Sequence, residues 1–151
     1  MGGTAMNPVE IYQSALNKVS AAVLAGDFAA FLTSFDLPYL LHTDSDRLLA
    51  STADDLHDEF QALHQLLKFR GVTHYERVAR RADYVDRKRI EGLHYTHQIK
   101  NGSHVAPPQV GRETLFLRDD RWLFCEAYFP TQMLSAIARG GSDDIKNGLR
   151  T

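Results

Sequence analysis

The stretch Arg89–Gly102, RIEGLHYTHQIKNG, decides the fold of this chain. Its first part, 89–100, mixes β-branched, aromatic and polar residues in the way that strands do. It then ends in Asn101-Gly102, the strongest short signal for a two-residue hairpin turn. Strands joined by such a turn pair antiparallel. The stretch therefore predicts a strand over 89–100 and an antiparallel partner that begins near Ser103.

The same pattern continues on both sides of this stretch. β-Branched and aromatic residues recur between turn signals from Val72 to Phe129. Pro107 and Pro108 must interrupt one of the strands, because proline cannot donate to a ladder. The predicted strands are 72–84, 89–100, 103–118 and 121–129, with turns at 85–88, Asn101-Gly102 and Asp119-Asp120. Together they predict a four-stranded antiparallel meander.

Helical signals gather before the meander. Asn7 can cap a helix that ends at Gly26, and Thr52 can cap a longer helix with an apolar stripe that ends at Gly71. The remaining predicted elements are a short helix over 28–35, one or two short strands over 38–52, and a final short helix over 131–139. Helices that precede an antiparallel sheet indicate the α+β class.

The composition excludes several classes of partner. The chain has 151 residues, a net charge of −2 and a single cysteine, Cys125. A nearly neutral chain has no overall field that draws it to nucleic acid or to an anionic membrane, and no apolar run reaches membrane-spanning length. We therefore expect a cytoplasmic protein without nucleic-acid or membrane partners. One domain is expected over 7–139, between a flexible tail at 1–6 and a polar tail at 140–151.

Two pairs of histidines invite a metal site, but their spacing argues against it. His57 and His64 are two helical turns apart, which is about 10 Å along the axis. His94 and His97 are three residues apart on a strand, where side chains alternate between faces. The helix pair cannot hold one ion at about 2 Å, and the strand pair cannot do so unless a bulge intervenes. The sequence predicts no metal and no cofactor.

The two faces of the 89–100 strand differ in polarity. One face carries Leu93, Tyr95, His97 and Ile99, and the other carries Gly92, His94, Thr96, Gln98 and Lys100. The first face is more apolar, so we expect it to lie against the helices. Tyr95 and His97 then point into the protein, and His94 points outward.

His97 gains a partner if the preceding hairpin has a two-residue loop at Asp86-Arg87. In that register Glu76 lies opposite His97. A buried histidine beside a carboxylate is a candidate general acid or base. The alternative is a core histidine that is satisfied by one hydrogen bond.

The last hairpin supplies a second candidate. A two-residue loop at Asp119-Asp120 places Leu115 opposite Phe124 and Glu113 opposite Glu126. Glu126 is surrounded by aromatic residues, so it either pairs with an arginine across the sheet or serves a pocket with a raised pKa. Both faces of this hairpin are apolar. That pattern predicts a homodimer that forms through the sheet.

Four segments together resemble the nuclear-transport-factor-2-like superfamily, also called SnoaL-like. They are LAGDFAAFLTSF (24–35), LPYLLHT (37–43), RIEGLHYTH (89–97) and RDDRWLFCEAYF (118–129). The resemblance spans roughly Asn7 to Phe129. It implies a strongly curved sheet that the helices wrap into a cone, with a pocket at the mouth.

Members of this superfamily include steroid isomerases, polyketide cyclases, dehydratases, transport adaptors and many proteins with no assigned activity. The fold alone therefore does not decide the function. Isomerase-like members use an aspartate base on the first strand after the second helix. This chain has no carboxylate there before Asp44.

Two functions remain open. The first is a pocket for a small apolar or cyclic ligand, with cofactor-free proton transfer of the isomerase, dehydratase or cyclase kind. Its catalytic residues would be His97, Glu76 and Glu126, and its ligand-binding residues would be Tyr12, Tyr95, His42 and Trp122. The second is a non-catalytic dimeric module whose cone is filled by its own side chains.

Overall fold

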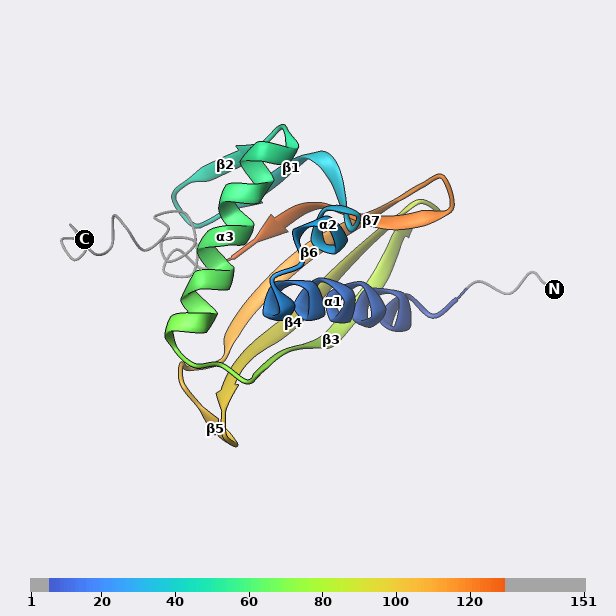
Figure 1. Cartoon of the computed structure of the whole chain (residues 1–151). Coiled ribbons are helices and arrows are strands. Elements are labelled where there is room, and N and C mark those ends of the chain that lie inside the picture. Colours follow the sequence, from blue (N-terminus) through green and yellow to red (C-terminus); the bar gives the residue numbers. More distant parts are fainter. Residues whose placement is uncertain (1–5, 130–151) are drawn as a thin grey trace.

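The computed structural model describes residues 6–129, and within that range the chain forms three helices and seven strands (Figure 1). The helices are α1 (Pro8–Ala25), α2 (Phe28–Leu32) and α3 (Ala53–Phe69). The strands are β1 (Phe35–His42), β2 (Arg47–Ala50), β3 (His74–Asp86), β4 (Arg89–Lys100), β5 (Ser103–His104), β6 (Gln109–Arg118) and β7 (Arg121–Tyr128). The helix predicted over 131–139 and the tail over 140–151 lie outside the described residues.

The first helix begins and ends where its sequence signals place it. The Asn7 side chain accepts a hydrogen bond from the Val9 backbone N–H at 2.8 Å, and Pro8 occupies the first turn. Gly26 ends the helix in the left-handed conformation at φ 74°. Within residues 6–129, no helix is both long and apolar enough to span a membrane.

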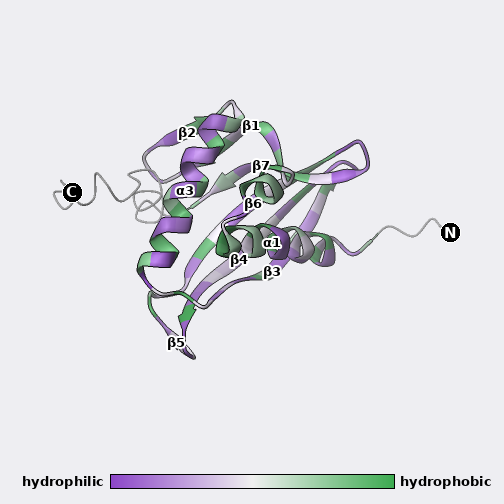
Figure 2. Cartoon of the chain, in the orientation of Figure 1, coloured by the Kyte–Doolittle hydropathy of each residue, from purple (hydrophilic) through white to green (hydrophobic). Residues whose placement is uncertain are grey.

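The third helix is held by a capping box and by one apolar stripe. The Thr52 side chain accepts from the Asp55 backbone N–H at 3.1 Å, and the Asp55 carboxylate accepts from the Thr52 N–H at 3.2 Å. Hydrophilic and hydrophobic residues alternate along α3 (Figure 2). The predicted stripe is confirmed, because Leu56, Phe60 and Leu67 are buried.

The strands form one sheet in which β2, β1, β7, β6, β4 and β3 are neighbours in that order, while β5 pairs with β4. The α+β class and the antiparallel pairings of the meander are confirmed. One pairing departs from the antiparallel sheet that we predicted, because β1 runs parallel to β7 and makes the sheet mixed. This pairing joins segments from opposite ends of the described chain, where no hairpin turn could reveal it. Figure 1 shows the helices over one face of the sheet.

The short second helix ends earlier than predicted. It stops at Leu32, and β1 begins at Phe35, so Pro38 lies inside a strand rather than at the predicted start of one. The parallel pairing of β1 with β7 is irregular between Phe35 and Leu40. That irregularity surrounds Pro38, whose nitrogen has no hydrogen to donate to the ladder.

The hairpin between β3 and β4 has the predicted partners but a different turn. Asp86 pairs with Arg89, so the two-residue loop is Arg87-Lys88. Two irregularities in β3 then shift the pairing by two positions. The result is that Glu76 lies opposite His97, as predicted, although the turn was predicted one residue too early.

The last hairpin confirms the predicted loop and only part of the predicted register. Leu115 lies opposite Phe124 as expected. An irregularity between Thr114 and Leu115 adds one residue to β7, so Glu126 lies opposite Thr114 and not opposite Glu113. Side chains alternate along a strand, and one extra residue therefore moves Glu126 to the face opposite Phe124.

The face of β4 that lies against the helices is the more polar one, contrary to our prediction. His94 is fully buried, whereas Tyr95 is 39% exposed and His97 lies on the outer face. Part of this polar face has partners: His94 Nδ1 contacts the Tyr12 hydroxyl, and Gln98 Oε1 accepts from Arg70, whereas His94 Nε2 and Thr96 Oγ1 have none among residues 6–129. Gly92 also leaves room for the Tyr12 ring of α1, which would otherwise contact a side chain.

Candidate functional site

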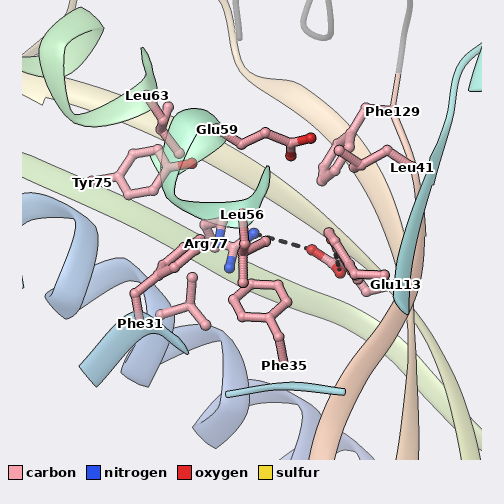
Figure 3. A pocket seen from close by; sticks show the side chains of 12 residues that line it. Phe31, Phe35, Leu41, Leu56, Glu59, Leu63, Tyr75, Arg77, Glu113 and Phe129 are labelled. Carbon is pink, nitrogen blue, oxygen red and sulfur yellow. Dashed lines mark hydrogen bonds and ion pairs between the residues drawn. The ribbon is translucent and has the colours of Figure 1, made fainter. Parts of the chain in front are cut away.

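A cavity lies between α3, β1 and the inner face of the sheet (Figure 3). Its volume is about 60 Å³, and most of its lining is apolar. The side chains of its lining that carry polar groups are Tyr39, Glu59, Tyr75, Arg77 and Glu113. This volume holds a few water molecules or a ligand with few heavy atoms, and it is well below the roughly 300 Å³ of ordinary ligand sites.

A buried carboxyl group and a buried guanidinium group meet at one wall of the cavity. Arg77 Nη1 of β3 lies 3.4 Å from Glu113 Oε2 of β6, and the Tyr39 hydroxyl of β1 donates to Glu113 Oε1 at 2.9 Å. Arg77 Nε also donates to Ser20 Oγ of α1 at 3.2 Å. Three strands and a helix thus fix one carboxyl group, so its orientation is set before any ligand arrives.

Two carboxyl groups at this cavity hold their protons more tightly than usual. Burial raises the pKa of Glu113 to about 7, against the opposing effects of Arg77 and of the hydrogen bond from Tyr39. Burial and the nearby acidic residues of α3 raise the pKa of Glu59 to about 7. Figure 3 shows Glu59 reaching across the cavity toward Phe129. A carboxyl with a pKa near 7 can both give and take a proton at neutral pH.

A second buried pair lies behind this wall. The Tyr12 hydroxyl and His94 Nδ1 are 2.6 Å apart, and both side chains are fully buried. Burial, aided by the charge of Arg77, lowers the pKa of His94 to about 2, so the ring is neutral. His94 Nε2 has no hydrogen-bond partner among residues 6–129. This pair borders the cavity residues without lining the cavity itself.

The sequence did not identify the residues of this wall. Arg77 and Glu113 each alternate with residues that are polar or solvated, so nothing local distinguishes them from surface charges. The available signal was the face of the strand on which each charged residue lies, because alternate residues share a face. Glu113 shares a face with Leu115, which we expected to pair with Phe124, and both of these apolar residues are buried. A charge on a core-facing position indicates a buried partner or a site.

The predicted pair of His97 and Glu76 lies outside the cavity. The two are opposite one another, but on the outer face, and Glu76 is exposed. His97 contacts His104 instead, with Nδ1 and Nε2 3.0 Å apart. Tyr95 is also on that face, beneath the guanidinium of Arg80 at 5.3 Å from the ring centre. These three residues are not positioned to act in the cone.

His42 and Glu126, which we predicted for different roles, lie together. His42 Nε2 and Glu126 Oε2 are 2.5 Å apart in a groove of about 220 Å³ on the outer face. Glu126 thus has a histidine partner in place of the predicted arginine, and it lies outside the cone cavity because the extra residue in β7 turns it outward.

Trp122 and Tyr12 also differ from the predicted ligand contacts. Trp122 lines a separate groove of about 290 Å³ between α1 and the start of β7, and its ring packs on Tyr84. Tyr12 points inward as expected, but it contacts His94 and does not line the cavity. Of the seven predicted site residues, none lines the cone cavity.

Residues 6–129 contain no cluster of three or more histidine, cysteine, aspartate or glutamate side chains placed to hold one metal ion. The cavity lining itself supplies groups for acid and base chemistry, namely the Glu59 and Glu113 carboxyls beside the positive charge of Arg77.

Comparisons with known proteins bear on the fold. No protein-family model and no curated protein matches the sequence. Solved structures do match, among them an NTF-2-like protein of unknown function from Shewanella oneidensis, with a TM-score of 0.61 at 12% identity over 82% of this chain and 99% of that one. An NTF2-like protein with a cystatin-like fold from Novosphingobium aromaticivorans has a TM-score of 0.59 at 12% identity, covering 82% and 80%. A candidate ketosteroid isomerase from Shewanella frigidimarina has a TM-score of 0.58 at 11% identity, covering 79% and 94%.

Proposed function

We infer that this chain, which has the nuclear-transport-factor-2-like fold, binds a compact small molecule in its cone and exchanges a proton with it through Glu113. The observation that carries the proposal is a buried carboxyl with a pKa raised to about 7 on the wall of a cavity. Arg77 and Tyr39 orient that carboxyl. Arg77 also supplies the positive charge that would stabilise an oxyanion on the ligand.

The size of the cavity limits the ligand. At about 60 Å³ the cavity accepts a small cyclic or branched compound only if the lining moves. The apolar lining favours a hydrocarbon body, and the polar wall favours one carbonyl or hydroxyl group. A small cyclic ketone meets both requirements. Such proton transfer needs no cofactor.

The test follows hydrogen–deuterium exchange at the α-carbon of cyclopentanone in D₂O by NMR. In this reaction the Glu113 carboxylate takes the α-proton, the C–H bond breaks to leave an enolate, and the carbon then takes a deuteron from the exchanged carboxyl group. We expect the protein to accelerate exchange, with a rate that rises as the pH passes about 7, where Glu113 ionises.

Two variants make this test specific. Glu113→Gln removes the base and is expected to bring the rate to that of buffer. Glu126→Gln removes a carboxyl on the outer face and is expected to leave the rate unchanged. Circular dichroism verifies that both variants are folded. Equal exchange rates for the wild-type protein and for folded Glu113→Gln would contradict proton transfer through Glu113.

A non-catalytic module is the second candidate, and the small volume of the cavity favours it. Under this function the Arg77–Glu113–Tyr39 group is structural and the cone is closed by its own side chains. It predicts that cyclopentanone neither exchanges faster than in buffer nor shifts the NMR signals of residues around the cavity.

We also propose a homodimer through the outer face of the sheet. Val78, Tyr95 and Val110 lie side by side on β3, β4 and β6, and they are 43%, 39% and 41% exposed. An exposed apolar row of this kind across three strands of a sheet is typical of a surface that another protein covers. We expect light scattering to give twice the 17.0 kDa mass of the chain.

Tyr95→Glu is expected to reduce that mass to one chain, because it places a charge in the middle of the row. Leu49→Glu is the matched control, since Leu49 is 54% exposed on β2, away from the row. A wild-type mass of 17.0 kDa at micromolar concentration would exclude the dimer.

A further inference from the structure

Histidines from three strands gather at one end of the outer face of the sheet. Ile99 of β4 lies between His74 of β3 and His104 of β5, so these three side chains share a face. His97 stands two residues before Ile99 and shares that face, and Glu76 of β3 lies directly opposite His97. His104 and Glu76 are exposed and His97 is half-buried, so solvent reaches the group.

Two of these rings have nitrogens that approach each other closely. His97 Nδ1 and His104 Nε2 are 3.0 Å apart, and the ring centres are 5.3 Å apart. Both residues belong to one hairpin, because β4 passes to β5 through the Asn101-Gly102 turn. Their spacing is therefore set by a local and tightly constrained piece of backbone.

The separation matches that of neighbouring ligands on one metal ion. Imidazole nitrogens bind such an ion at about 2.1 Å, so two of them lie about 3.0 Å apart at the right angle of a tetragonal Cu²⁺ or Ni²⁺ site and about 3.4 Å apart at the tetrahedral angle of Zn²⁺. Without a metal, the same separation is a hydrogen bond between two rings that water can also reach, which contributes little. The rings can accept an ion with their present spacing between nitrogens.

We propose that His97 and His104 form a binding site for a borderline divalent cation of the Zn²⁺, Ni²⁺ and Cu²⁺ class. Imidazole ligands select this class, and Cu²⁺ is expected to bind most tightly. No third ligand-type side chain within residues 6–129 converges on the pair, so water fills the remaining positions. Glu76 is the carboxylate nearest in the register. The site is independent of the cone and of its proposed function.

The test is a titration of the full chain, free of any histidine tag, with Zn²⁺ at about pH 7.5 by isothermal calorimetry. One ion per chain is expected. His97→Ala and His104→Ala are each expected to weaken binding on the order of 100-fold, because each removes half of a chelate. His57→Ala is the matched control: His57 packs edge-on against Phe28, far along the chain on α3, and its removal should change nothing.

Electron paramagnetic resonance of bound Cu²⁺ gives a second reading that does not depend on affinity. The spectrum is expected to show coupling to two ring nitrogens in the wild-type chain and to one in either variant. Wild-type binding that equals that of His97→Ala or His104→Ala would overturn the proposal. So would a loss of binding in His57→Ala, or a copper spectrum that both single variants leave unchanged.

Discussion

Gly92→Ala tests whether the Tyr12 ring sets the inward face of β4. A Cβ at Gly92 would lie 2.5 Å from two carbons of the Tyr12 ring and 2.6 Å from a third. Carbon atoms in contact normally stand about 3.5–4.0 Å apart, so one group must move by about 1 Å. Tyr12 is fully buried and its hydroxyl is hydrogen-bonded with His94, so a movement of the ring disturbs that contact.

The expected cost of Gly92→Ala combines three effects. Overpacking a core costs about 1–3 kcal/mol. Displacing Tyr12 from His94 leaves a buried polar group without its partner, at about 1–3 kcal/mol. Alanine returns about 0.5–1 kcal/mol, because glycine weakens a strand. We therefore expect the free energy of unfolding to fall by about 2–4 kcal/mol, a large part of the 5–15 kcal/mol typical of a domain.

Urea denaturation followed by circular dichroism measures this change, and a double-mutant cycle gives its cause. Tyr12→Leu lacks the outer ring carbons that the new Cβ would meet. In that background Gly92→Ala should cost less than about 0.5 kcal/mol. A cost of that size in the wild-type background, or equal costs in both backgrounds, would refute the role that we give to the Tyr12 ring.

Three further outcomes are expected. The pKa of Glu113 in the folded protein is raised to about 7, so Glu113 contributes stability that is present below about pH 4.5 and is lost as the pH rises through 7. The pKa of His94 is lowered, so keeping His94 neutral destabilises the fold as the pH falls below about 6.5. Glu113→Gln should therefore lose up to about 3 kcal/mol more than wild type between pH 8 and 5 in urea titrations, and equal slopes would be contrary to the raised pKa. Thr52→Ala should lower the free energy of unfolding by about 1 kcal/mol in the same assay, and an unchanged value would show that the Thr52 cap does not stabilise α3. His42→Ala should change it by less than about 1 kcal/mol, since the pair with Glu126 is partly exposed, and a larger loss would show that the pair is structural.

The parts of the fold that local sequence signals encode could be predicted. The caps of α1 and α3 and the turns at Asn101-Gly102 and Asp119-Asp120 are each defined by a few neighbouring residues. The parallel pairing of β1 with β7 and the irregularities in β3 and β7 depend on contacts between distant segments. No neighbouring residues encode those contacts, so they could not be predicted.

The site was harder to predict for a physical reason. We expected the more apolar face of β4 to be buried, whereas the chain buries His94 and exposes Tyr95. Burying a polar face costs less where its groups find partners, and the partner of His94 Nδ1 is Tyr12, which lies in the first helix. The same holds for Glu113, whose partners come from β1 and β3. Such pairs become visible only in three dimensions.

The place of β7 between β1 and β6 has a consequence for chain synthesis and for aggregation. β7 is the last described strand, yet it joins the β1–β2 hairpin to the rest of the sheet. A chain that ends before Arg121 would therefore leave two strands, β1 and β6, each with an unpaired edge. Unpaired edges are templates for association with other chains. A nascent or truncated chain is thus vulnerable at two edges until this one strand is in place.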